Sequence, residues 1–515
     1  MSESKRSALD PELLRLVEPL DEHNETLLDN VHPPEWTNPQ PADRYHMVVV
    51  GAGTAGLVTA AGAAGLGARV ALVERRLMGG DCLNYGCVPS KGLIRAARAW
   101  HEARTAAERF AGPAVRGEGS FAAAMQSMRA LRARISRHDS ARRFRDLGVD
   151  VFIGEGRDVA GDPNDGGEQR FRFRRAVIAT GARPVAPPIP GLDEVDYLTN
   201  ETLFTLTDLP RRLGIIGGGP IGCEMAQTFA RFGADVTLFD MASHVLVRED
   251  ADAAALVQQS LLDDGVGLAL EASISRVEAS DTGVRVHFER DDDAHVVEVD
   301  RLLVAVGRAP NVEGIGLEAA GVDYERSGVQ VDDRLRSSNS KIYAVGDVAS
   351  RFKFTHMADA LARIAIQNAL FFGRSKASDL VVPWCTYTSP EIAHVGLYAE
   401  DAEDRGLEVE TSKIQLSEVD RAVLERAEEG FLRLVVLAGS DRIVGATLVA
   451  EHAGEMLGEL ALAVTHGIGL GKIASTIHPY PTQSEVIKKA GDAWRRTKLT
   501  PTVKRIFELY FRLFR

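Results

Sequence analysis

The sequence predicts an α/β fold built from two copies of one strand–loop–helix–strand unit, followed by a C-terminal domain of mixed strands and helices. In the first copy an apolar run leads into a glycine-rich loop at Gly51, Gly53 and Gly56, and the next apolar strand ends at Glu74. This change from a β-type to a helical pattern also explains the charge-free stretch 47–68, which is otherwise long enough to span a bilayer.

The second copy repeats this order with Gly217, Gly219 and Gly222 and a strand that ends at Asp240. Residues 51–74 and 217–240 align without a gap. In such a unit the first glycine makes a tight turn, the second lets the backbone approach a pyrophosphate, and the third lets the helix pack on the strand. The final acid accepts hydrogen bonds from a ribose hydroxyl. We therefore predict two Rossmann-like dinucleotide-binding domains.

Two cysteines, Cys82 and Cys87, follow the first unit in a run that ends at Lys91. On an ideal helix, residues five apart have Cα atoms ~8.6 Å apart, which exceeds the ~7 Å limit for a disulfide. If the two sulfurs bond, the backbone between them must depart from an ideal helix, and Gly86 is where it most easily does. A strained bridge is readily reduced, as a catalytic disulfide should be. For this spacing alone, two buried unbonded thiols are the alternative.

The composition is that of a large globular protein, and 515 residues predict three or four domains. A net charge of −13 argues against nucleic acid as a partner. The four cysteines do not form the framework of a secreted disulfide-rich protein. Because residues 1–20 lack the pattern of a signal peptide, we expect the protein in the cytoplasm.

These motifs, in this order, resemble the flavoprotein pyridine nucleotide–disulfide oxidoreductases, which include dihydrolipoyl dehydrogenase, glutathione reductase and mercuric reductase. The resemblance covers residues 45–493. Besides the glycine loops and the cysteine pair, it rests on four further segments: 177–182 with Thr180 and Gly181, 304–310 with Gly307, 343–348 with Asp347, and a C-terminal segment ending at Glu485.

The resemblance implies a homodimer with an FAD-binding domain, an NAD(P)-binding domain and a C-terminal α+β dimerisation domain. The expected divisions are 1–44 (an extension forming a surface arm or partly disordered leader), 45–190 with 311–380 (FAD), 191–310 (NAD(P)), 381–493 (dimerisation) and 494–515 (a basic amphipathic tail). Within them, residues 92–145 are expected to be helical and 161–167 to form a turn between strands.

The family also implies roles for single residues. FAD would lie on the first glycine loop, with Glu74 on its adenosine ribose and Asp347 on its ribityl and pyrophosphate region. Electrons would pass from the nicotinamide through the flavin to the disulfide. Cys87 would be the sulfur nearest the flavin, and Cys82 the thiol that attacks the acceptor. Lys91 and Glu224 resemble the ion pair found near the reactive edge of the flavin.

The second glycine loop would hold the nicotinamide cofactor. Asp240 repels a 2′-phosphate, and Met241 and Ala242 supply no guanidinium, so NADH is favoured over NADPH. Arg248 is close enough in sequence to keep NADPH open. No resident metal site is expected.

The C-terminal segment departs from the family pattern. Relatives with a thiol base carry histidine five residues before the position of Glu485, and this chain has Tyr480 there, with His478 two residues earlier. A phenol is a poor base at neutral pH. Mercuric reductase also has tyrosine at this point, yet no cysteine follows Cys385 to deliver a metal, and an N-terminal C-x-x-C module is absent.

The expected acceptor is therefore a small disulfide or a soft metal ion, in an enzyme similar to mercuric reductase. The alternatives are dihydrolipoyl dehydrogenase and a redox-sensing flavoprotein with little turnover.

The tail, residues 494–515, has seven basic residues and a single acid. Its apolar residues recur at helical spacing: Val503, Ile506, Phe507, Tyr510, Leu513 and Phe514. A helix docked on the partner subunit, a membrane-surface helix and a partner-binding helix all fit this pattern.

Overall fold

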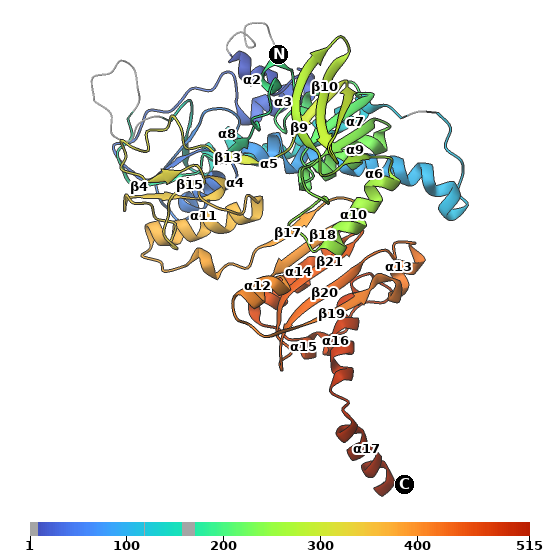
Figure 1. The fold of residues 1–515 in the computed structure, drawn as a ribbon. Helices are drawn as coiled ribbons and strands as arrows, with labels where there is room; N and C mark the ends of the chain where they lie inside the picture. The colour runs from blue at the N-terminus through green and yellow to red at the C-terminus, as the bar shows by residue number, and fades with distance from the viewer. Residues whose placement is uncertain (1–8, 118, 157–169, 515) are drawn as a thin grey trace.

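The computed structural model describes residues 9–117, 119–156 and 170–514 (Figure 1). The predicted turn at 161–167 lies outside these residues. The first domain holds a five-stranded parallel sheet in the order β16-β4-β1-β2-β3. Its strands are β1 (Tyr45–Val50), β2 (Val70–Glu74), β3 (Val149–Ile153), β4 (Phe173–Ile178) and β16 (Ile342–Ala344). Helices α4 (Thr54–Gly65) and α11 (Thr355–Leu370) contact each other and share a core with this sheet.

The second domain repeats the first unit. Its four-stranded parallel sheet has the order β12-β6-β7-β8 and carries a three-stranded antiparallel sheet beside it. The elements are β6 (Arg212–Ile216), α9 (Pro220–Phe232), β7 (Asp235–Phe239), α10 (Ala251–Asp263), β8 (Gly267–Ala269), β9 (Ser273–Ser280), β10 (Gly283–Arg290), β11 (Asp293–Val299) and β12 (Arg301–Val304). The short strands β5 (Ala182–Pro184) and β13 (Arg308–Pro310) pair where the chain leaves and re-enters the first domain.

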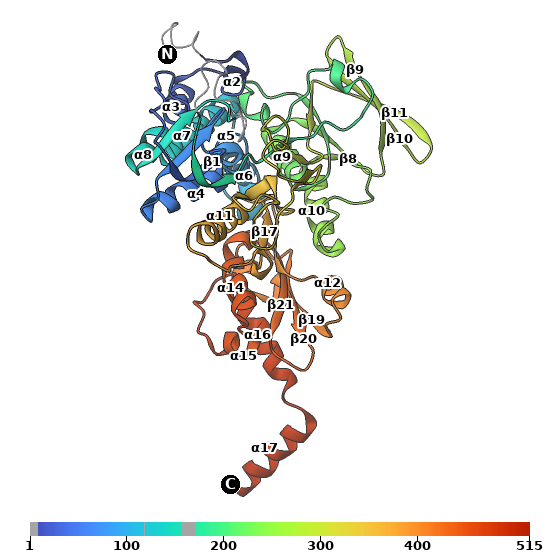
Figure 2. The ribbon, with the colours of Figure 1, turned by 90° about the vertical axis from the view of Figure 1, so that its left-hand side faces the viewer.

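The C-terminal domain is an antiparallel sheet in the order β17-β18-β21-β20-β19, packed against helices. Its strands are β17 (Pro383–Thr386), β18 (Glu391–Gly396), β19 (Val409–Gln415), β20 (Phe431–Leu437) and β21 (Ile443–Ala450). Its helices are α12 (Ala399–Asp404), α13 (Asp420–Leu424), α14 (Ala453–His466), α15 (Leu470–Ser475) and α16 (Glu485–Thr497). A last helix, α17 (Pro501–Leu513), projects from this domain (Figure 2). The predicted fold class is confirmed.

Most of the stretch 92–145 is helical, as predicted; a non-helical connection separates α6 from α7. It contains most of α6 (Cys87–Phe110), then α7 (Phe121–Ser136) and α8 (Ala141–Asp146). Helix α6 contacts α9 of the second domain, and Leu93 and Ala97 share one core with Phe229. The helix that begins at a predicted redox cysteine therefore bridges the two nucleotide-binding domains.

The expectation of a surface arm is wrong for residues 9–44. Helices α2 (Pro11–Arg15) and α3 (Glu22–Val31) pack into the first domain, where Leu27, Leu28 and Val31 are fully buried. The cause is a helical apolar spacing, which the prolines at 33–41 obscure in the sequence.

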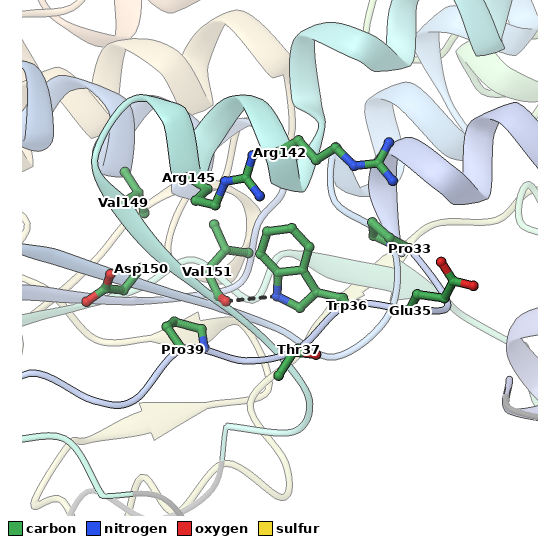
Figure 3. Close-up of a pocket in the computed structure, with 10 residues that line it drawn as sticks. All are labelled: Pro33, Glu35, Trp36, Thr37, Pro39, Arg142, Arg145, Val149, Asp150 and Val151. Atoms are coloured by element: carbon green, nitrogen blue, oxygen red, sulfur yellow. Dashed lines mark hydrogen bonds between the residues drawn. The ribbon is translucent and has the colours of Figure 1, made fainter.

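Residues 33–39 then cover the outer strand of the first sheet. Trp36 donates a hydrogen bond to the carbonyl of Val151 (3.1 Å), and the side chain of Asn38 exchanges two hydrogen bonds with the backbone of Ile153 (3.0 and 2.8 Å). An uncovered edge strand is an aggregation hazard. The shallow pocket between this segment and α8, lined in part by Trp36 and Arg145, is shown in Figure 3.

Because Leu28 is buried, Leu28→Ala should lower the free energy of unfolding by about 2–5 kcal/mol. The matched control is Leu66→Ala, since Leu66 is 62% exposed. Chemical denaturation of the flavin-loaded protein measures both. Equal effects of the two substitutions would contradict the packed position of α3.

Candidate active site

The two glycine loops have the same geometry. Gly51 (φ 101°) and Gly217 (φ 111°) are left-handed, which a side chain would strain. A Cβ on Gly56 or on Gly222 would lie 1.8 Å from the carbonyl oxygen of the first glycine of its loop. A Cβ on Gly219 would meet nothing within 4 Å, so the middle of the second loop faces open space. The positions that must turn and pack are therefore separate from the position that faces a ligand.

In the first loop the middle glycine lies against the start of α5 (Gly80–Asn84). A Cβ on Gly80 would come within 2.6 Å of Gly53 Cα. The two glycines thus allow the nucleotide loop and the cysteine segment to approach at backbone distance.

The acids at the ends of β2 and β7 hold these loops. Glu74 accepts hydrogen bonds from the N–H of Ala52 in the loop (2.6 Å) and from the N–H two residues further along its own chain (2.8 Å). Asp240 accepts from the N–H of Gly218 (2.5 Å) and again from the N–H two residues further along (2.8 Å). Desolvation raises the pKa of the Glu74 carboxyl. Sequence reasoning assigned these acids only to ribose; the structure shows that they also fix the loops.

The helix between the two cysteines breaks where the sequence predicted. Helix α5 ends at Asn84, and Gly86 (φ −128°, ψ −114°) is the N-cap of the 24-residue α6, which starts at Cys87. Both cysteines are free thiols. Cys87 Sγ lies 3.5 Å from Thr355 Oγ1. A thiol at a helix N-terminus faces unpaired N–H groups and the positive end of the helix dipole, which favours its thiolate.

The two thiols differ in acidity. The neighbouring Cys82 thiol lowers the pKa of Cys87 to about 6, with further contributions from Thr355 and the charge of Lys91. The Cys87 sulfur, together with burial, raises the pKa of Cys82. Cys87 is therefore the more acidic thiol of the pair.

The predicted ion pair is present. Lys91 Nζ donates to Glu224 Oε2 at 2.9 Å, and Glu224 is 5% exposed. The other oxygen of Glu224 accepts from the N–H of Tyr387 (3.0 Å), and Lys91 Nζ lies 4.4 Å from the centre of the Tyr387 ring. Lys91 is in α6, Glu224 in α9, and Tyr387 follows β17. All three domains therefore meet at this pair.

Asp347 lies in a cluster of cations that sequence reasoning missed. Arg308 forms an ion pair with Asp81 (3.0 Å) and lies 3.9 Å from Asp347, while Lys353 donates to the carbonyl of Asp347 (2.8 Å). Burial raises the pKa of the Asp347 carboxyl. Arg308 lies inside the motif 304–310, so the sequence could have indicated its role in this cluster, whereas Lys353 lies in no motif.

This cluster fits the FAD dinucleotide that the motifs imply. Within the described ranges, Arg308 Nε is buried without a hydrogen-bond partner, so it can still donate to a phosphate. The N-terminus of α4, which follows the first glycine loop, offers further N–H donors to an anion.

Thr180, Gly181 and Gly307 lie where the chain crosses between the two nucleotide-binding domains. Thr180 Oγ1 donates to the carbonyl of Asn311 (2.8 Å), and the Asn311 side chain donates back to the carbonyl of Thr180 (2.8 Å). Gly181 (φ 70°) and Gly307 (φ 149°) make the turns of this crossing. Their direct contact with a cofactor stays a prediction.

The C-terminal residues form contacts of their own. His478 Nε2 lies 2.9 Å from Glu459 Oε1, so the carboxylate partner of this histidine comes from α14 rather than being Glu485. Tyr480 is 69% exposed and donates to Asp420 (2.8 Å), which raises the pKa of its phenol. Glu485 begins α16 with one oxygen buried and unpartnered among the described residues.

None of these three residues is hydrogen-bonded to Cys82 or Cys87 in the part of the chain that the structure describes. A role beside the dithiol, reached from the partner subunit, stays a prediction.

A buried arginine connects the N-terminal extension to the cysteine segment, and sequence reasoning missed it. Arg132 in α7 is 1% exposed and donates to the carbonyl of Asn84 (2.7 Å) and to the side chain of Asn24 in α3 (2.7 Å). The N–H of Met78 donates to the carbonyl of Val31 (3.1 Å). The extension therefore holds the segment 78–84, which contains Cys82, at both ends: directly at Met78 and through Arg132 at Asn84.

Comparison with known proteins decides the family. Residues 45–362 match the model described as "Pyridine nucleotide-disulphide oxidoreductase", and residues 382–491 match the dimerisation domain of the same name. The chain belongs to this family. It is therefore an FAD-dependent enzyme that uses pyridine nucleotides.

Named relatives fall into two groups. A mercuric reductase of Bacillus cereus is 36% identical over 87% of this chain and 71% of its own length. A dihydrolipoyl dehydrogenase of Chlorobaculum tepidum is 31% identical over 87% of this chain and 97% of its own. Among solved structures, the HOCl-induced flavoprotein disulfide reductase RclA from Escherichia coli is 30% identical with a TM-score of 0.77, covering 86% of this chain and 99% of its own. None of the described helices is long and apolar enough to cross a membrane.

If the Cys82 thiol lowers the pKa of Cys87, removing that thiol should raise it. In the reduced enzyme, the thiolate of Cys87 should form with a midpoint near pH 6 in wild type and at a higher pH in Cys82→Ala. Cys82→Ser keeps an O–H donor and should lie between them. Thiolate absorbance against pH gives the three midpoints; a common midpoint near 9 would reject the assignment.

Arg132→Met leaves the Asn84 carbonyl and the Asn24 side chain unpaired in the protein interior. The expected cost is about 1–3 kcal/mol for each unpaired group, with weaker FAD retention because the cysteine segment loosens. Arg134→Met, at an exposed position of the same helix, is the control. Thermal unfolding and flavin release measure both effects, and wild-type behaviour of Arg132→Met would show that this contact is dispensable.

Proposed function

We propose that this enzyme oxidises NADH and passes two electrons through FAD to a Cys82–Cys87 disulfide, which then reduces a thiol-reactive acceptor. The observation that supports this most is the unequal placement of the two thiols: Cys87 begins α6 beside Thr355, while Cys82 lies in α5, and this difference gives them different tasks. When bound, FAD supplies two-electron transfer between the nicotinamide and the disulfide.

The proton balance follows from the residues. Two electrons and one proton break the S–S bond; the proton stays on Cys82, and Cys87 remains a thiolate next to Thr355 and within the field of Lys91. Lys91 and Glu224 would stand near the reactive edge of the flavin, where a fixed ion pair keeps the local charge balanced.

The kind of acceptor depends on how Cys82 loses its proton. To attack a disulfide, Cys82 must first lose this proton to a base. Tyr480 is exposed and its pKa is raised by Asp420, so it is unsuited to that task. A soft metal ion favours the thiolate directly, since metal binding itself releases thiol protons. We therefore propose a metal ion as the first candidate acceptor, as in the mercuric reductase relatives.

A small disulfide is the second candidate, and the contact between His478 and Glu459 favours it. A carboxylate that holds an imidazole supports its use as a base. We propose that the chain works as a homodimer through residues 381–493, with His478 and Tyr480 reaching the dithiol of the partner subunit. This arrangement would also serve dihydrolipoyl dehydrogenase activity.

Acceptor choice can be tested directly. The enzyme is reduced anaerobically with NADH and mixed with Hg(II), Cu(II), lipoamide or glutathione disulfide; Cu(II) is included because RclA has been solved as a Cu(II) complex. Reoxidation by a metal ion, lost in Cys82→Ser, is the expected result. Fast reoxidation by lipoamide would favour dihydrolipoyl dehydrogenase, and reoxidation by oxygen alone would favour a redox sensor.

NADH should be preferred to NADPH because the Asp240 carboxylate repels a 2′-phosphate. Asp240→Asn keeps an acceptor for the Gly218 N–H but removes the charge, so the ratio of kcat/KM for NADH over NADPH should fall by about tenfold, as for the loss of one charge interaction near 1.4 kcal/mol. Steady-state kinetics with both cofactors measure it. An unchanged ratio would assign the preference to another residue, with the exposed Arg248 the first to test.

A further inference from the structure

Helix α17 presents an apolar face that no described residue of the chain covers. It projects away from the C-terminal domain in both views (Figures 1 and 2), and none of its residues is buried. The exposed apolar side chains on and next to it are Ile506, Phe507, Leu509, Tyr510, Phe511, Leu513 and Phe514. Contiguous exposed apolar surface of this kind marks an interaction site.

The composition and width of this face favour one kind of partner. At 100° per residue, the apolar side chains cover about 200° of the helix circumference, from Leu509 through Tyr510 to Phe511. A helix that packs on a protein surface needs an apolar stripe of about 100° or more, so this face is wider than such packing requires. A helix that lies in a membrane interface combines an apolar face rich in Phe and Leu with cations on its polar face, and α17 has both.

The charges on α17 also favour a membrane surface as the partner. The polar side of α17 carries Lys504, Arg505 and Arg512 with one acid, Glu508. Among the described residues, none of these three cations is paired with a carboxylate. The chain as a whole has a net charge of −13, so an anionic bilayer would repel the rest of the molecule and attract the tail.

We propose that α17 binds the surface of an anionic membrane, with its apolar face at the acyl boundary and its cations toward the headgroups. Helix α16 carries the connection to the enzyme, because Val486 and Ile487 are fully buried in the C-terminal domain. A short segment, 498–500, then leads into α17. The helix lies on the bilayer and does not cross it. This places the redox reaction at a membrane surface, which the proposed electron transfer alone does not require.

The test uses the full-length flavin-loaded protein and sedimentation with vesicles of phosphatidylcholine, with or without 30% phosphatidylglycerol, a composition of the order used to mimic anionic leaflets. Wild type should bind the anionic vesicles at least about tenfold more than the neutral ones. The double variant Phe507→Asp/Tyr510→Asp should lose this binding by about tenfold or more, and Lys504→Glu/Arg505→Glu should lose the preference for anionic lipid. Phe372→Asp, at an 87% exposed phenylalanine outside the tail, should bind like wild type.

Each other outcome overturns the proposal. Equal binding to both vesicles, or binding kept by the double variant, excludes α17 as an anionic membrane contact. If wild type binds neither vesicle and the double variant shifts from dimer to monomer in gel filtration, a second copy of the chain covers the face instead. NADH-driven flavin reduction, measured on the same samples, tests the proposed function separately, since none of the described tail residues contacts Cys82, Cys87, Lys91 or Glu224.

Discussion

The redox centre depends on one interruption of helical backbone, at Gly86. Without it, α5 and α6 would form one helix, and the two cysteines would be too far apart to bond. With it, Cys87 starts a new 24-residue helix, while Cys82 stays in the preceding helix α5 and lowers the pKa of Cys87. A Cβ at Gly86 would come 2.9–3.0 Å from side-chain and backbone atoms of Asp81. The same residue therefore allows the disulfide and makes its two sulfurs unequal.

Helix α6 connects the cysteine segment to the second and third domains. Lys91, one turn after Cys87, binds Glu224 of the second domain, which accepts from Tyr387 of the third. Between the two cysteines, Arg132 joins Asn84 to Asn24 of the N-terminal extension. The orientation of the thirteen-residue stretch 79–91 therefore depends on contacts with both nucleotide-binding domains, the dimerisation domain and the extension. This explains why the extension is packed rather than loose.

The sequence predicted the features that depend on local backbone chemistry: the glycine loops and the break at Gly86 follow from spacing and motif. The ion pair of Lys91 with Glu224 is a tertiary contact that the family resemblance implied. Sequence reasoning missed other contacts that only the tertiary fold creates: Glu459 beside His478, and Arg132 between Asn24 and Asn84, are each separated from their partners by many residues. The extension was expected to be a surface arm because of its prolines, although Leu27, Leu28 and Val31 recur at helical spacing. Lys353 lies in no motif at all.

The proposed function requires Cys87 to be the thiolate beside the flavin and Cys82 to be the thiol that meets the acceptor. These roles are measured most directly by the thiolate–flavin charge-transfer absorbance after anaerobic reduction, compared in wild type, Cys82→Ser and Cys87→Ser. We expect the band in wild type and Cys82→Ser and its loss in Cys87→Ser. A band that persists in Cys87→Ser, or that disappears only in Cys82→Ser, would contradict these roles.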